Sequence, residues 1–272
     1  MPHNLLNHDQ SNISVLTADD TMTRAMALNL AVWHEISVKP YGIQTFWTES
    51  LWWRERGNAP IYLAAIVMDG QTPDDALFSD LQTVQEAWAA TTIELYECWG
   101  RRDLSEIGFE QRWNNPWYLR PAAPVDEAVL PDGLSIEIVS TADQLAEFER
   151  ASWEGFEEPE DADVAFRDRQ PFSWHASATL DDPGMYYLIA RLDGQVVAGT
   201  IAYVTEDMVG IYGISTLPRF RRRGYATALV RATVALRPDL PVSVYPDPDT
   251  VPIYAGMGFV RAGNIAVWQK KG

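Results

Sequence analysis

Residues 211–230 read IYGISTLPRFRRRGYATALV, and this stretch decides the fold expected for the second half of the chain. The residues up to Thr216 predict a strand, which Pro218 ends. Gly224 then precedes an apolar-periodic segment that predicts a helix ending at Leu236. An arginine-rich turn is therefore expected between the end of a strand and the start of a helix.

The turn has the composition of an anion-binding site. The first turn of a helix offers unpaired backbone N–H groups and a partial positive charge. Gly224 permits close approach of a ligand to the backbone, and Ala226 adds no bulk. Positive charge comes from Arg219, Arg221, Arg222 and Arg223. The segment predicts a ligand that carries phosphates. The alternative is a solvated basic turn with a structural role only.

Other classes of phosphate and charge-driven binding are disfavoured. The sequence contains no Gly-Lys-Ser/Thr and no Gly-x-Gly-x-x-Gly, which disfavours nucleoside triphosphate hydrolysis and a dinucleotide fold. The formal net charge of -17 repels nucleic-acid backbones and anionic lipid, so neither partner is expected. No cluster has metal-ligand spacing, so no metal is expected. The single cysteine, Cys98, excludes an intramolecular disulfide.

The length of 272 residues fits one large domain or two modest ones. No basic segment followed by a long apolar run opens the sequence, and no run of apolar residues is long enough to cross a membrane. A cytoplasmic location is expected.

Periodicity in the second half predicts a mixed α/β sheet. Asp193-Gly194 is a hairpin signal between two alternating segments. Strands are expected at residues 135–140, 185–192, 195–204, 208–216, 241–245 and 259–269, and helices at 141–156, 224–236 and 249–257.

The first half reads as a shorter version of the second. Strands are expected at residues 12–16, 61–68, 92–99 and 109–119, and helices at 21–35, 44–56, 73–90 and 103–107. IELYECWGRRDLSEIGF (93–109) and VSVYPDPDTVPIYAGMGF (242–259) share an early Tyr and a final Gly-Phe at similar spacing. This similarity predicts an internal duplication. The proline-rich stretch PAAPVDEAVLPDG predicts a linker at residues 123–133, between domains at 1–122 and 134–272.

Two motifs of the second half resemble those of the GNAT superfamily of acyl-CoA-dependent N-acyltransferases. Arg221-x-x-Gly224-x-Ala226 is similar to the family's pyrophosphate loop. Tyr254-x-x-x-Gly258-Phe259 is similar to its Tyr-x-x-x-Gly-Phe segment. The resemblance covers roughly residues 134–271 well and the first half weakly. It implies two tandem GNAT-like domains in an α/β fold, the first shortened and degenerate.

The degenerate half is expected to have lost acyl-CoA binding. Its turn at the corresponding place, DGQTPDD at residues 69–75, is acidic and lacks the arginine-glycine motif. An acidic turn repels a pyrophosphate, so two roles stay open for the first half. The first half is structural, or it forms one wall of the acceptor pocket.

The resemblance implies transfer of an acyl group from the acetyl-CoA thioester directly to a primary amine, expected to belong to a small molecule. Backbone groups of the turn would hold the pyrophosphate, and the preceding strand would bind the pantetheine arm and polarise the thioester carbonyl. At one position, that of Asp247, the family often has Asn. The cofactor-binding candidates are Ile214, Ser215, Thr216, Arg221, Arg222, Arg223, Gly224, Tyr225, Ala226 and Asp247.

Two residues are candidates for proton transfer. Tyr254 would protonate the departing thiolate, and the alternative is a packing role. His175 would take the proton from the amine, and the alternative is a structural histidine. Trp153, Phe156, Phe172 and Trp174 are candidates for an aromatic wall of the acceptor pocket, and the alternative is that they pack in the core.

Other functions stay open from the sequence. The nearest alternatives are an N-acetyltransferase that acts on proteins and a module that binds acyl-CoA without turnover. A purely structural partner protein is a further possibility, and it predicts that Arg221 and Arg222 are replaceable without effect on any ligand. The sequence gives no indication of the oligomeric state.

Overall fold

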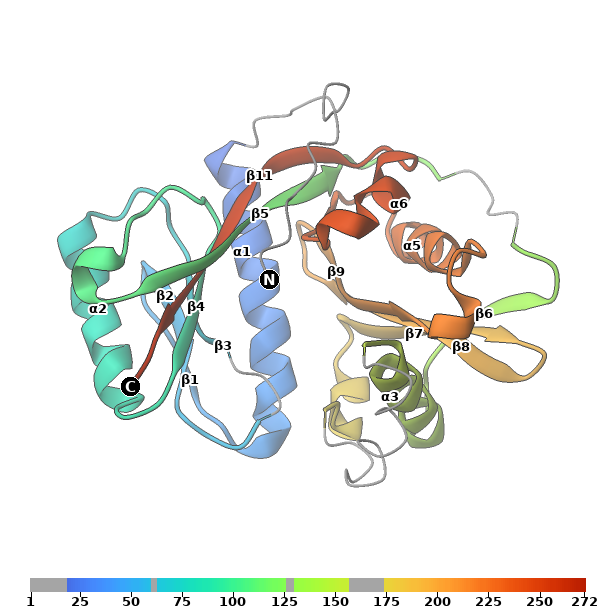
Figure 1. The fold of residues 1–272 in the computed structure, drawn as a ribbon, viewed down its shortest axis with the longest axis horizontal. Helices are drawn as coiled ribbons and strands as arrows, with labels where there is room; N and C mark the ends of the chain where they lie inside the picture. The colour runs from blue at the N-terminus through green and yellow to red at the C-terminus, as the bar shows by residue number, and fades with distance from the viewer. Residues whose placement is uncertain (1–18, 60–62, 126–129, 157–173) are drawn as a thin grey trace, which may run out of the picture.

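The computed structural model describes residues 19–59, 63–125, 130–156 and 174–272. Their strands form one mixed sheet with the order β1-β2-β3-β4-β11-β5-β10-β9-β8-β7-β6, flanked by helices (Figure 1). The strands are β1 (Thr45–Trp47), β2 (Leu51–Arg54), β3 (Leu63–Val67), β4 (Ile93–Glu97), β5 (Glu110–Arg120), β6 (Leu134–Ile138), β7 (Met185–Leu192), β8 (Gln195–Val204), β9 (Val209–Thr216), β10 (Val242–Val244) and β11 (Val260–Lys270).

The helices that form lie close to ranges expected from the sequence, although one expected helix, at residues 44–56, does not form. They are α1 (Asp20–Val38), α2 (Asp74–Ala87), α3 (Ala142–Phe156), α5 (Tyr225–Leu236) and α6 (Val251–Ala255). Short 3₁₀ turns are η1 (Lys39–Tyr41), η2 (Ser105–Ile107), η3 (Ser177–Asp181), η4 (Pro218–Phe220) and η5 (Pro248–Thr250). The described part of the chain holds no helix with the length and apolar character needed to cross a membrane.

The two halves repeat the same succession of strand pairings. In the first half β1 and β2 pair antiparallel, β2 and β3 antiparallel, and β3 and β4 parallel. In the second half β7 and β8, β8 and β9, and β9 and β10 pair in the same way. The tandem repeat expected from the sequence is therefore visible in the topology of the sheet.

The halves also exchange their last strands. β11, from the second half, pairs with β4 and β5 of the first half. β5, from the first half, pairs with β10 of the second half. Each long strand thus inserts beside the other half, and Figure 1 shows the pair running across the top of the molecule. One sheet spans both predicted domains, and the boundary at 123–133 stays a prediction.

The faces of the second half are covered by different helices. α3 and α5 both pack on β8 and β9, from opposite sides of the sheet (Figure 1). Successive strand residues alternate accordingly, since Ile201 and Tyr203 join the apolar cluster that contains Phe148 of α3. Ala202 joins the cluster that contains Leu229 of α5. α1 of the first half stands between the two halves.

One element of the first half differs from its prediction. Residues 44–56 were expected to be helical, but they form the antiparallel pair β1 and β2, with Phe46 opposite Trp53. Aromatic residues at short spacing fit a helical face and a hairpin equally well, and here the pairing of β2 with β3 decides between them. The strand expected at 12–16 lies outside the described residues.

Candidate functional site

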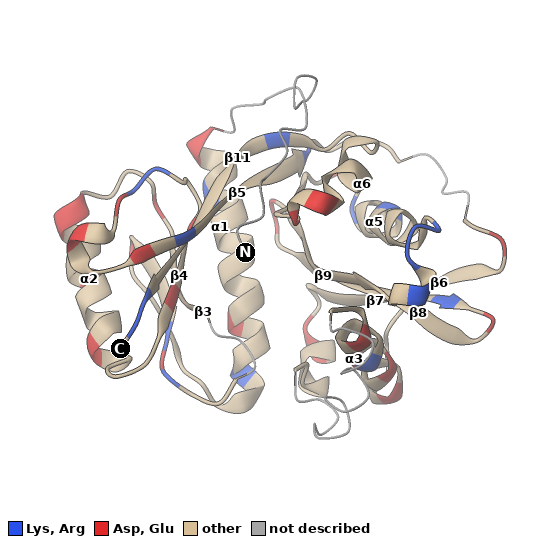
Figure 2. Ribbon diagram, in the orientation of Figure 1, with Lys and Arg blue, Asp and Glu red and all other residues tan. Residues whose placement is uncertain are grey.

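The arginine turn lies where the sequence places it, between the end of β9 and the start of α5. η4 makes one tight turn after β9, and Gly224 caps α5 with a φ of 84°. Arg222 also has a positive φ, 62°, which a non-glycine residue adopts at a cost. Figure 2 shows the basic ribbon at this place. The exposed arginines and the first turn of a helix thus form one positively charged surface.

The side chain of Arg221 also links the turn to α3. Its Nε donates to the carbonyl of Thr216 at 3.2 Å, and its guanidinium also donates to the carbonyl of Gly155, at the end of α3, at 2.8 Å. A Cβ on Gly155 would lie 2.8 Å from the Cβ of Ser215, so α3 and β9 meet here at backbone distance. Arg221 therefore fixes the turn against α3, while Arg222 is exposed to solvent.

The other predicted cofactor-binding residues occupy varied environments. Ser215 is buried, and its Oγ has no hydrogen-bond partner among the described residues. Tyr225 is buried beside Phe220. Asp247 precedes η5, where its backbone carbonyl, not its carboxylate, accepts from Thr250. The remaining candidates are Ile214, Thr216, Arg223 and Ala226, which lie on β9, in the turn and in the first turn of α5.

Strands β9 and β10 pair over a short stretch only. Their parallel pairing joins Val242 to Val209 and Ser243 to Gly210. Beyond it β9 carries a bulge against β8, and Gly213 within this bulge has a φ of 53°. The stretch of β9 that follows, up to Thr216, therefore continues past the end of its pairing with β10.

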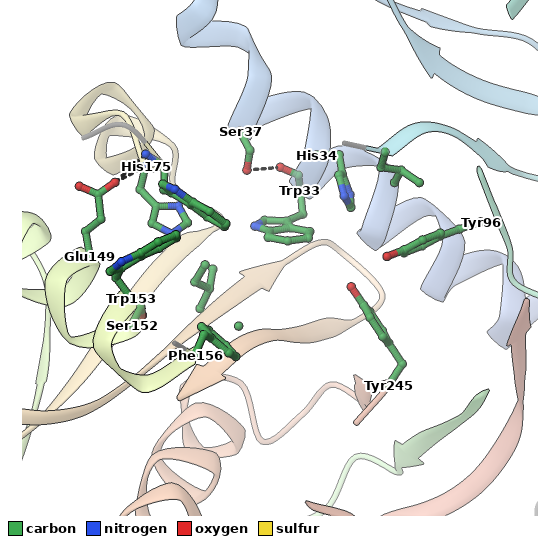
Figure 3. Close-up of a pocket in the computed structure, with 14 residues that line it drawn as sticks. Trp33, His34, Ser37, Tyr96, Glu149, Ser152, Trp153, Phe156, His175 and Tyr245 are labelled. Atoms are coloured by element: carbon green, nitrogen blue, oxygen red, sulfur yellow. Dashed lines mark hydrogen bonds between the residues drawn. The ribbon is translucent and has the colours of Figure 1, made fainter. Parts of the chain in front are cut away.

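A cavity of about 420 Å³ opens beside this stretch, on the face of the sheet that carries α3 (Figure 3). Both halves of the chain line it. The first half contributes Trp33, His34, Ser37, Leu63 and Tyr96, and the second half contributes Glu149, Ser152, Trp153, Phe156, Trp174, His175, Ile201, Gly213 and Tyr245. Of the expected aromatic wall, Trp153, Phe156 and Trp174 line the cavity, and Phe172 lies outside the described residues.

Hydrogen bonds to its backbone and packing of its ring hold His175 in place. The carboxylate of Glu149, on α3, accepts from the backbone N–H groups of Trp174 at 2.6 Å and His175 at 3.2 Å. The imidazole ring packs against Phe148 and Tyr187. Burial lowers the pKa of His175 to about 4, so the ring is neutral at pH 7.

Tyr254 lies away from this cavity. It belongs to α6, on the face of the sheet covered by α5, whereas His175 precedes η3 on the face covered by α3. Tyr254 is fully buried against Phe259, and its hydroxyl has no hydrogen-bond partner among the described residues. Burial raises the pKa of this hydroxyl, which therefore stays protonated. The structure does not bring the two catalytic candidates together.

Several cavity residues were not singled out as site residues. His34 was not among the candidates from the sequence, yet it lines the cavity. Its Nδ1 faces the carbonyl of Leu30 at 2.7 Å, and a carbonyl only accepts, so Nδ1 carries the proton and Nε2 is an acceptor. Burial lowers its pKa to about 4. The signal was available, because the first half was considered as a wall of the acceptor pocket.

Tyr96 and Tyr245 are the matching tyrosines of the internal repeat. Their rings meet edge to face with centroids 6.2 Å apart, and both line the cavity (Figure 3). Two equivalent positions of the repeat thus converge on one site. The sequence indicated the equivalence but not the contact, which depends on the exchange of β5 and β11.

The turn of the first half that corresponds to the arginine turn is formed by residues 69–75, and the side chain of Arg102 binds it. The guanidinium of Arg102 donates to the carbonyls of Asp69 at 3.3 Å and Thr72 at 2.6 Å, and it pairs with Asp74 at the start of α2. A Cβ on Gly70 would lie 2.6 Å from the ring of Trp99. The turn is acidic, and its carbonyl groups are already bonded to the Arg102 side chain. Within the described residues, no group of His, Cys, Asp or Glu is placed to hold a metal ion.

Comparison with known families identifies the second half. The model of the acetyltransferase (GNAT) family matches residues 142–240. This segment is a GNAT domain. It contains α3, the strands from β7 to β9, the arginine turn and α5. A comparison with curated proteins found no match.

Solved structures extend the likeness of the fold beyond the GNAT domain. A GCN5-related N-acetyltransferase from Kribbella flavida is 17% identical with a TM-score of 0.64, over 91% of this chain and 96% of that one. A functionally unknown protein from Staphylococcus epidermidis is 16% identical with a TM-score of 0.59, over 86% and 97%. A GCN5-related N-acetyltransferase from Sphaerobacter thermophilus is 13% identical with a TM-score of 0.53, over 94% and 94%. These structures show that both halves together adopt a fold found in other chains.

Proposed function

We propose that the protein transfers an acetyl group from acetyl-CoA to the primary amine of a small molecule. One observation carries the proposal: the arginine turn and the 420 Å³ cavity share strand β9. The cavity reaches β9 at Gly213, and the turn follows the end of that strand at Thr216. A ligand that lies along this short stretch has its phosphates at the turn and its other end at the cavity.

The residues present fit acetyl-CoA. The turn supplies backbone N–H groups and exposed arginines for a pyrophosphate. The stretch from Ile214 to Thr216, beyond the pairing with β10, supplies main-chain groups for an amide-bearing arm. The buried hydroxyl of Ser215 has no partner among the described residues, and it is a polar atom for a ligand to satisfy. Acetyl-CoA supplies the activated thioester.

The two faces of the sheet would serve different steps. Tyr254, on the α5 side and protonated, donates a proton to the departing thiolate. The cavity, on the α3 side, holds the amine. His175 and His34 are both neutral there and accept a hydrogen bond from the amine without adding positive charge. Their low pKa makes each a weak base, so they orient the neutral amine, and the proton that its nitrogen loses on acetylation passes to water.

A direct assay tests this function. Purified protein is incubated with acetyl-CoA and single small primary amines, and both free thiol and N-acetylated amine are measured. We expect amine-dependent thiol release with a matching amount of product. Acetyl-CoA binding without amine-dependent release supports a non-catalytic module instead, and faster acetylation of peptide N-termini than of any small amine supports a protein acceptor.

A further inference from the structure

The cavity is lined by aromatic rings on both sides. Trp33 of α1 and Trp153 of α3 lie on opposite sides of it (Figure 3). Tyr212 stacks on Trp33 with ring centroids 4.0 Å apart and 3° between the planes, which fixes the orientation of this indole. Trp174 meets Trp153 edge to face at 5.2 Å. A rigid slot of this kind favours a flat apolar group.

The described lining of the cavity carries little charge. Among the described residues that line it, none is Lys or Arg. His34 and His175 are neutral at pH 7 because burial lowers their pKa to about 4. Glu149 is the one acidic residue among the described residues of the lining, and its carboxylate accepts from two backbone N–H groups. Within the described part of the chain, the lining therefore offers no Lys or Arg to a carboxylate or phosphate.

We infer that the acceptor is an arylalkyl primary amine that carries no carboxylate, phosphate or other acidic group. The inference rests on the proposed function, because it names the substrate class of the same site. An aromatic ring fills the slot between the tryptophans and gains the free energy of burying its apolar surface. An acidic group on the same amine would be buried without a counter-ion, which costs binding free energy.

A matched set of amines separates these two requirements. The probes are 2-phenylethylamine, phenylalanine, which adds a carboxylate to the same ring and amine, and butylamine, which lacks the ring. We expect kcat/KM for 2-phenylethylamine to exceed that for each of the others by at least about tenfold. Equal or higher kcat/KM for phenylalanine or for butylamine overturns the inference.

Variants of the slot test whether the ring is recognised where the structure indicates. Trp153→Ala should lower kcat/KM for 2-phenylethylamine about tenfold or more and change that for butylamine little, so the ratio between the two amines falls. Trp113→Ala is the control, since Trp113 is 53% exposed on β5 and does not line the cavity. An unchanged ratio in Trp153→Ala contradicts the assignment.

A second variant avoids the risk that Trp153→Ala folds poorly. Phe156 lines the cavity but is 62% exposed, so Phe156→Ala disturbs the core little. It should lower the same ratio of amines, by about threefold or more. An unchanged ratio in Phe156→Ala counts against the slot in the same way.

Calorimetric titration with acetyl-CoA separates failure of the inference from failure of the proposed function. A protein that binds acetyl-CoA but neither binds nor acetylates 2-phenylethylamine overturns the inference and leaves the acyl-CoA site intact. A protein that does not bind acetyl-CoA overturns the proposed function itself.

Discussion

The hydroxyl of Tyr212 donates a 2.6 Å hydrogen bond to Oδ1 of Asn29, and this bond joins a strand of the second half to α1 of the first. Asn29 is fully buried, and its amide also donates to the carbonyls of Tyr203 at 3.0 Å and Met208 at 3.1 Å. A Cβ on Gly210 would lie 2.2 Å from Oδ1 of Asn29, so this glycine admits the contact. Four residues further along α1, Trp33 enters the cavity.

Removing the Asn29 side chain should weaken the contact between α1 of the first half and the strands of the second half. Asn29→Ala leaves two buried carbonyls and the Tyr212 hydroxyl without this partner, and we expect the free energy of unfolding to fall by about 3 kcal/mol. Tyr212→Phe removes one of the bonds and keeps the ring stacked on Trp33, so it should cost about 1 kcal/mol. Urea denaturation monitored by tryptophan fluorescence measures both. Equal stability of Asn29→Ala and the unmodified protein would show that this contact contributes little to the free energy of unfolding.

Tyr254→Phe should separate turnover from binding. The substitution keeps the ring packed against Phe259 and removes a buried hydroxyl that has no partner among the described residues, so we expect stability to be preserved. Loss of the proton donor should lower kcat by about a hundredfold, with unchanged affinity for acetyl-CoA. Steady-state kinetics and calorimetry check the two effects. Full activity of the variant would assign Tyr254 a packing role.

The pH dependence of the rate should follow the amine and not a histidine. His175 and His34, with pKa values of about 4, stay neutral from pH 5 to pH 8. An alkyl amine has a pKa of about 10, so its neutral fraction rises about tenfold per pH unit over that range. We expect kcat/KM to rise in parallel. An inflection near pH 6.5 would show that a histidine with an ordinary pKa controls the reaction.

His34 should also make the fold sensitive to acid. Its pKa is about 4 in the folded protein against an ordinary 6.5, so the folded state binds fewer protons between these values. The contribution of His34 to the free energy of unfolding is therefore fully present above about pH 6.5 and is lost as the pH falls toward 4. His34→Asn retains a donor for the Leu30 carbonyl and should reduce the pH dependence of the free energy of unfolding. An identical pH dependence in both proteins would place the titration elsewhere.

Local patterns were sufficient for most elements of the second half. The Asp193-Gly194 signal predicted the hairpin of β7 and β8, and both residues have the positive φ that this turn requires. The helix expected at 141–156 is α3, and the Oγ1 of Thr141 accepts from the backbone N–H of Gln144 at its start. The arginine turn and α5 were also placed correctly, because glycine, proline and apolar periodicity act over a few residues.

Features that depend on distant pairing could not be predicted. Nothing in the sequence of β11 indicates that it lies between β4 and β5, because an alternating strand does not specify its neighbours. The cavity follows from this exchange and from the docking of α1, so no local pattern marked Glu149 as a cavity residue, and the repeat did not show that Tyr96 and Tyr245 meet there. The hairpin of β1 and β2 was taken for a helix for the same reason, since its partner strand is β3.

Titration of the purified protein with acetyl-CoA by calorimetry tests most directly the claim that one half of the chain binds the thioester. We predict one site per chain, because the turn of the first half is acidic and already bonded to the Arg102 side chain. Arg222→Glu should weaken that site by about tenfold or more, because a charge that attracts the pyrophosphate becomes repulsive. Arg101→Glu, in the first half, is the control and should leave the affinity unchanged. Two sites per chain, or no binding, would contradict the account.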